Sequence, residues 1–113
     1  MSVFAVALLV AAAALGKNIA GVASLSGELD LANANLDALA AVPKIGVPLL
    51  IMGSRDDRYL DAHDAQKLLR AAGSSQKSLA EFAGADHGWD LLALSHAQPA
   101  NRLLVRFLRR VTE

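Results

Sequence analysis

The chain has 113 residues, enough for one small domain with a single hydrophobic core but not for two such domains. Hydrophobic residues make up 54% of the sequence and charged residues 19%, a composition that excludes an intrinsically disordered chain. The 11 basic and 11 acidic residues cancel, and this zero net charge argues against nucleic acid and for a small-molecule or protein partner. Because there is no cysteine, the sequence offers no disulfide, cysteine zinc site or cysteine nucleophile. Redox chemistry therefore does not indicate the compartment, for which we slightly favour the cytoplasm.

The first predicted element is a buried helix over residues 4–15. It belongs to an apolar run, residues 3–15, that is shorter than the about 20 residues needed to cross a bilayer. No lysine or arginine precedes this run, so the charged start of a secretory signal is also missing. We therefore predict a buried helix that ends at Gly16, rather than a signal segment or a membrane anchor.

Two strands and a short helix are predicted next. Residues 19–25 form a short strand, and residues 35–42 have a helical pattern that ends before Pro43. The clearest strand is residues 47–52, because a continuously apolar sequence is typical of a strand covered on both faces. This strand is expected to terminate at Gly53-Ser54.

A further helix and a third strand follow. Asp61 is a suitable N-cap for a helix that ends before Gly73. The inward stripe of this helix is predicted to consist of Ala65, Leu68, Leu69 and Ala72. Residues 77–83 are predicted to form the third strand, which ends before Gly84.

The last predicted element is an amphipathic helix that begins at Pro99. Its apolar positions recur with the period of a helix and are Leu103, Leu104, Phe107, Leu108 and Val111. Its opposite face holds Arg102, Arg106, Arg109 and Arg110. We interpret these arginines as a solvated face rather than as a membrane-binding or protein-binding surface.

This alternation of helices and strands predicts a three-layer α/β fold, in which a short parallel sheet of about three strands has helices on its flanks. No repeat, low-complexity segment or linker divides the chain, so residues 1–113 are expected to form a single domain. In such sheets, ligands bind beyond the carboxyl ends of the strands. The polar side chains at those ends are Ser24, Ser26, Asp56, Asp57 and His87.

These groups include two of the three that a nucleophilic hydrolase requires. Such an enzyme needs a hydroxyl, a histidine that accepts its proton, and a carboxylate that orients the histidine. An aspartate after one strand and His87 after the next are expected to converge at one edge of the sheet. The structural alternative is that His87 is only a hydrogen-bonded loop histidine.

Two segments carry a resemblance to a known family. Residues 47–60 read Val-Pro-Leu-Leu-Ile-Met-Gly-Ser-Arg-Asp-Asp-Arg-Tyr-Leu, and residues 84–88 read Gly-Ala-Asp-His-Gly. They resemble the acid-bearing and histidine-bearing loops of α/β-hydrolases of the serine esterase, lipase and dienelactone-hydrolase type. The resemblance extends over nearly the whole chain and implies the C-terminal half of that fold. It further implies that Asp57 is the acid, with Asp56 as the alternative, and that His87 is the general base.

The nucleophile is harder to assign. The family carries it in a Gly-x-Ser-x-Gly elbow, a motif that this sequence lacks. Counting back from the first helix places Ser2 at the position of the nucleophile, although Phe4 stands where the family has the second glycine. Ser26, at the end of the first strand, is the alternative nucleophile. The oxyanion hole would retain only the Val3 amide, which implies a weak enzyme unless a second subunit supplies another donor.

No metal or cofactor is expected. A metal site could be imagined among acidic and histidine side chains that lie close in sequence, but their spacing matches neither a calcium loop nor a helical zinc motif. These residues are Asp56, Asp57, Asp61, His63 and Asp64.

Two functional hypotheses follow. In the first, the protein is a weak carboxylic ester hydrolase in which Ser2 attacks, His87 transfers the proton and Asp57 orients His87. In the second, it is a catalytically inactive, truncated hydrolase homologue that acts as an oligomeric or binding module. Under either hypothesis the outer edge of the first strand is expected to pair with a second copy, giving a homo-oligomer. The expected small-molecule partner is an ester, with no nucleic-acid or membrane partner.

Overall fold

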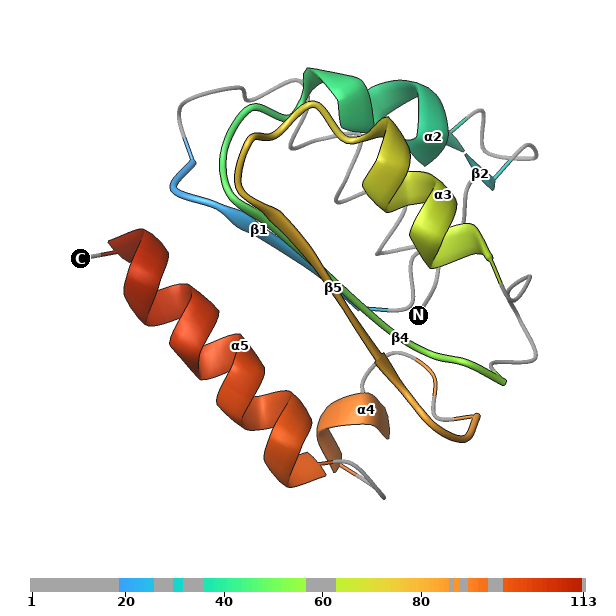
Figure 1. Cartoon of the computed structure of the whole chain (residues 1–113), viewed down its shortest axis with the longest axis vertical. Coiled ribbons are helices and arrows are strands. Elements are labelled where there is room, and N and C mark those ends of the chain that lie inside the picture. Colours follow the sequence, from blue (N-terminus) through green and yellow to red (C-terminus); the bar gives the residue numbers. More distant parts are fainter. Residues whose placement is uncertain are drawn as a thin grey trace.

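The computed structural model describes residues 19–25, 30–31, 36–56, 63–85, 87, 90–93 and 97–112 (Figure 1). Its elements are β1 (Val22–Leu25), β2 (Asp30–Leu31), β3 (Leu36–Asp37), α2 (Ala38–Ala41), the 3₁₀ helix η3 (Val42–Lys44), β4 (Leu49–Ser54), α3 (Asp64–Ala71), β5 (Lys77–Phe82), α4 (Asp90–Ala93) and α5 (Ala97–Thr112). The helix predicted over residues 4–15 lies outside the described residues. None of the described helices is long and apolar enough to cross a membrane.

The core of the fold is a parallel sheet in which β4 is the central strand. The strand order is β1-β4-β5, and both pairings are parallel. Every residue of β4 is buried, which confirms the prediction of a strand covered on both faces. The strand begins at Leu49 rather than at residue 47. It ends at Ser54, in agreement with the predicted terminus at Gly53-Ser54, and both residues still pair with β5, with Glu81 and Phe82 as their partners.

Helices cover both faces of this sheet and create two hydrophobic cores. Figure 1 shows α2 and α3 on one face, with α4 and α5 on the other. On the first face, Leu49 and Ile51 pack with Leu68 of α3. On the second, Leu50 and Met52 pack with Phe107 of α5. Successive residues of β4 thus face opposite layers, and the predicted three-layer α/β architecture is confirmed.

The connection between β1 and β4 differs from the single helix predicted over residues 35–42. It contains β3, the four-residue α2 and then η3, which includes Pro43 instead of ending before it. Proline is tolerated there because it occupies the first turn, where its missing N–H group would have no partner within the helix. The antiparallel pair of β2 and β3 was not predicted, since two residues per strand leave no readable periodicity.

Helix α3 has the predicted inward stripe but a later start. Leu68 and Ala72 are buried in the first core, with Ala65 and Leu69 packed against it. The helix begins at Asp64 with His63 as its N-cap, so the prediction of Asp61 at that position was wrong. His63 makes no side-chain capping hydrogen bond.

Helix α5 begins at Ala97, two residues before the predicted start, and Pro99 lies within its first turn. Four of its predicted apolar positions are buried or half-buried: Leu103, Leu104, Phe107 and Val111. Leu108 is 47% exposed, so its predicted inward position was wrong. The reason is that a single sheet face covers only part of the helix circumference, and Leu108 lies beyond that part.

Gly73 is required by a close approach between two elements rather than by a helix cap. A Cβ added at Gly73 would overlap the carbonyl oxygen of Pro43, and the Gly73 N–H group donates to Val42 O at 3.3 Å. We expect Gly73→Ala to lower the free energy of unfolding by about 1–3 kcal/mol, because the backbone must shift. Gly46→Ala is the control, since Gly46 is exposed and an added Cβ meets nothing within 4 Å. Thermal unfolding that gives equal midpoints for both variants would contradict this account.

Ser24 and Ser74 are both buried serines, but only Ser74 has hydrogen-bond partners among the described groups. The Ser74 hydroxyl donates to Gln76 O and accepts from Gln76 N, both at 3.1 Å. The Ser24 hydroxyl in β1 is fully buried and has no hydrogen-bond partner in the described parts of the chain. We therefore expect Ser24→Ala to stabilise the protein by about 1 kcal/mol and Ser74→Ala to destabilise it by about 1 kcal/mol. Denaturant unfolding of both variants measures the change in the free energy of unfolding. A destabilised Ser24→Ala variant would show that the hydroxyl has a partner.

Candidate active site

The loops that follow β4 and β5 are joined by backbone hydrogen bonds beyond the ends of both strands. The N–H group of Arg55 donates to Phe82 O at 2.9 Å, and the N–H group of Asp56 donates to Gly84 O at 2.9 Å. These bonds continue the parallel ladder that pairs Ser54 with Phe82. The acid loop and the histidine loop therefore begin side by side at the carboxyl edge of the sheet, where ligands bind in open α/β folds.

Gly84 makes the turn that leads to His87. Its φ angle is +94°, in the left-handed region that glycine adopts without strain. An added Cβ would meet nothing within 4 Å, so the backbone conformation and not a lack of space selects glycine here. Because Gly84 O also accepts the hydrogen bond from Asp56, the same residue turns the chain and links it to the acid loop.

His87 is half-buried and is anchored on its C-terminal side. Its carbonyl oxygen accepts a hydrogen bond from the N–H group of Asp90, the first residue of α4, at 3.2 Å. Helix α4 is in turn joined to α5, because the Asn101 amide Nδ2 donates to Leu92 O at 2.8 Å. The histidine loop is therefore anchored to the sheet before His87 and to the α4–α5 layer after it.

The structure brings together part of the predicted site. Asp56 is exposed, and its backbone lies beside the start of the histidine loop. Ser2, Ser26 and Asp57 lie outside the described residues. A carboxylate and an imidazole at one sheet edge can orient and transfer a proton, but they require a hydroxyl to act as a hydrolase.

Two further polar candidates differ in accessibility. Ser24 is fully buried within β1, so its hydroxyl cannot meet a substrate in this conformation. His63 is exposed at the start of α3. Among the described residues, no group of three or more histidine and acidic side chains is arranged to hold a metal ion.

Sequence reasoning did not identify two parts that hold the histidine loop. One is α4, which at four residues is too short for a periodic pattern, although Asp90 in its first turn is an acidic residue of the kind favoured there. The other is the Asn101 side chain, whose bond to Leu92 O joins residues nine apart in sequence. No local pattern indicates that bond.

Several solved structures are similar to this chain. A zinc-bound cold-adapted esterase from an Arctic intertidal metagenomic library is 19% identical, with a TM-score of 0.61 over 88% of this chain and 43% of that chain. A bacterial membrane phospholipase A is 19% identical, with a TM-score of 0.55 over 74% of this chain and 25% of that one. A structure from work on the metagenome-derived lipolytic enzymes LipS and LipT is 20% identical, with a TM-score of 0.51 over 64% of this chain and 29% of that one.

At these identities the likeness shows the fold, and the chain spans less than half the length of each of these proteins. No curated protein matches the sequence. The model of the serine aminopeptidase S33 family matches residues 9–89, a range that includes both the acid loop and His87. Because this match covers most of the sequence, and the sheet and both loops have the arrangement described above, the chain belongs to the serine aminopeptidase S33 family of α/β-hydrolases.

Proposed function

We propose that residues 1–113 form one α/β-hydrolase-like domain that hydrolyses carboxylic esters with a serine nucleophile. The observation that carries the proposal is the hydrogen bond from Asp56 N to Gly84 O, which joins the acid loop to the start of the loop that bears His87. The family match over the same two loops supports it. Ester substrates are favoured because the similar solved structures include esterases and lipolytic enzymes.

The proposed reaction uses Ser2, His87 and Asp57. The Ser2 hydroxyl attacks the ester carbonyl carbon while His87 accepts the hydroxyl proton, and His87 returns that proton to the departing alcohol. Water then attacks the acyl-serine in the same way and releases the carboxylic acid. Asp57 orients the imidazole and stabilises its charged form, with Asp56 as the alternative acid. Ser26 is the alternative nucleophile.

The sequence around Ser2 differs from the family at one position that bears on rate. Phe4 stands where the family has the second glycine of the Gly-x-Ser-x-Gly elbow. That glycine normally allows the sharp turn that exposes the nucleophile, so we expect slow turnover.

The second candidate function is a catalytically inactive homologue that acts as an oligomeric or binding module. It is favoured by Phe4, which stands where the family has the second glycine of the Gly-x-Ser-x-Gly elbow. It is also favoured by the outer edge of β1, which pairs with no other strand among the described residues. Such an edge presents backbone donors and acceptors to a second copy of the chain.

Hydrolysis of a short-chain nitrophenyl ester by highly purified protein tests the first function. We expect slow turnover by the wild type and a loss of roughly 10²-fold or more in His87→Ala and Ser2→Ala, because each removes a reacting group. Ser26→Ala should retain activity. Comparing Asp56→Asn with Asp57→Asn identifies the acid as the one whose loss lowers kcat. If the wild type is no faster than His87→Ala, the hydrolase function is wrong.

Sedimentation velocity tests self-association through β1. Val22 donates its N–H group to Pro48 O of the neighbouring segment, so the N–H group of Ala23 faces the outer edge of the strand. We expect the wild type to form dimers at micromolar concentration. Ala23→Pro, which removes that outer donor at a position where an edge strand tolerates proline, should be monomeric. Circular dichroism establishes that the variant is folded, and a monomeric wild type would exclude edge pairing.

A further inference from the structure

The outward half of α5 concentrates positive charge. The helix carries Arg102, Arg106, Arg109 and Arg110 but no acidic residue, although the whole chain is electrically neutral. All four arginine side chains are exposed. A neutral protein that places four cations and no anion on one helix has a strongly polarised surface, which attracts anionic partners.

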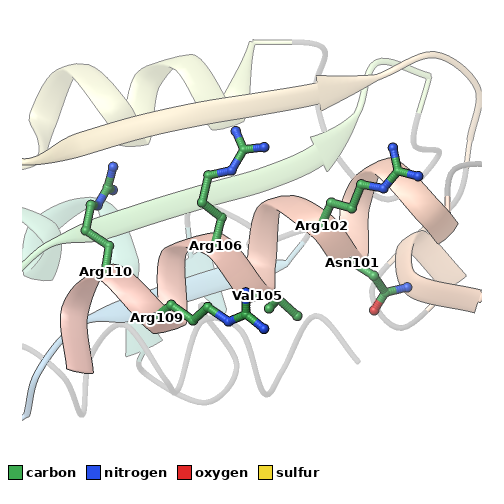
Figure 2. Close-up of a pocket in the computed structure, with 6 residues that line it drawn as sticks. All are labelled: Asn101, Arg102, Val105, Arg106, Arg109 and Arg110. Atoms are coloured by element: carbon green, nitrogen blue, oxygen red, sulfur yellow. The ribbon is translucent and has the colours of Figure 1, made fainter. Parts of the chain in front are cut away.

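Three of these arginines form a row. Figure 2 shows the side chains of Arg102, Arg106 and Arg110 extending on one side of the helix, with Val105 and Arg109 on the other. Because the row repeats every four residues, its members are spaced about 6 Å apart along the helix axis. The Arg110 guanidinium lies over the ring of Phe107, 5.8 Å from its centroid, which restricts its position.

Apolar side chains lie on the same outward half. Val105 is 44% exposed and Leu108 is 47% exposed, while Phe107 faces the sheet and is buried. Val105 lines a shallow groove of about 670 Å³ together with Asn101 and the four arginines. The surface therefore offers cations and exposed apolar side chains together, which is the combination found in helices that lie in the interface of a membrane.

A second concave site lies between the C-terminal part of α5 and the start of β5. A hollow of about 270 Å³ is lined by Arg110 and by polar residues at the start of β5, namely Ser75, Gln76, Lys77 and Ser78. The Lys77 ammonium group is held at 2.9 Å from Ala72 O. Arginine and hydroxyl donors in one hollow are suited to the oxygen atoms of a phosphate group.

Among anionic partners, a phospholipid surface fits these features better than a nucleic acid. Single-stranded nucleic acids are bound by aromatic side chains that stack on the bases, and none of the described residues that line the groove or the hollow is aromatic. The neutral charge of the chain also differs from that of nucleic-acid-binding domains. The exposed apolar side chains of Val105 and Leu108, by contrast, suit a bilayer, because apolar side chains can enter the boundary between headgroups and acyl chains.

We propose that the outward face of α5 docks the protein onto the surface of a bilayer rich in anionic phospholipids. Arg102 and Arg109, which flank Val105 on the helix surface, contact the phosphate groups together with Arg106, and Val105 and Leu108 enter the interface. The helix lies on the membrane and does not cross it. This assigns a partner to arginines that the sequence alone indicated only as a solvated face, and it is independent of whether the protein is an active hydrolase.

Co-sedimentation with large vesicles tests the docking. The probe is phosphatidylcholine vesicles with and without 30% phosphatidylglycerol, at about 50 mM and about 300 mM salt. We expect the wild type to bind the anionic vesicles at low salt and to bind both the zwitterionic vesicles and the high-salt samples at least tenfold more weakly. Since each basic residue near an anionic surface contributes about fivefold in affinity, Arg102→Gln combined with Arg106→Gln should weaken binding by about 25-fold.

A matched control removes the same charge from the opposite layer. Lys67 and Arg70 of α3 are also exposed and three residues apart, so Lys67→Gln with Arg70→Gln changes the net charge equally. This variant should bind anionic vesicles like the wild type, and thermal unfolding should show both double variants to be folded. Val105→Ser with Leu108→Ser should also weaken binding.

Several results would overturn the proposal. They are equal binding to both kinds of vesicle, equal losses in the two double variants, and binding that the arginine substitutions leave unchanged. Duplex DNA and polyglutamate are tested in parallel. If either binds in an arginine-dependent way while the anionic vesicles do not, the face belongs to a different class of partner.

Discussion

The burial of β4 on all sides is the constraint on which the rest of the structure depends. Its apolar side chains alternate between two cores, and its backbone pairs with β1 on one edge and β5 on the other. A strand of this kind cannot be covered unless helices pack on both faces, because each face presents side chains such as Ile51 or Met52 that must leave water. The three layers follow from this requirement.

The candidate site is a continuation of the same pairing. Parallel strands in register bring their carboxyl ends to one edge, and the bonds from Arg55 to Phe82 and from Asp56 to Gly84 carry the register into the loops. Backbone hydrogen bonds rather than side-chain contacts therefore set where the acid loop begins relative to the histidine loop. The left-handed turn at Gly84 then takes the chain away from the ladder toward His87.

The sequence was informative where burial is continuous or periodic. It predicted β4 from an unbroken apolar run, the stripe of α3 around Leu68, and the placement of Asp56 and His87 after neighbouring strands. It failed where structure depends on partners distant in sequence. The exposure of Leu108 depends on how much of α5 one sheet face can cover. Likewise, the bond from Asn101 to Leu92 has no local signature.

Helix α5 contributes to the core, to the histidine loop and to the charged surface through different residues. Its inward residues, including Ala100 and Phe107, close the second core, and Asn101 near its start holds α4 and so the end of the histidine loop. Of its arginines, Arg110 lies over the Phe107 ring, whereas Arg102 and Arg106 are exposed on the outward half of the helix. A change to the charge of Arg102 and Arg106 is therefore expected to leave the core and the loop contacts in place. In physical terms, the docking proposed for the outward face of α5 and the hydrolysis proposed for the sheet edge rest on separate parts of one small fold.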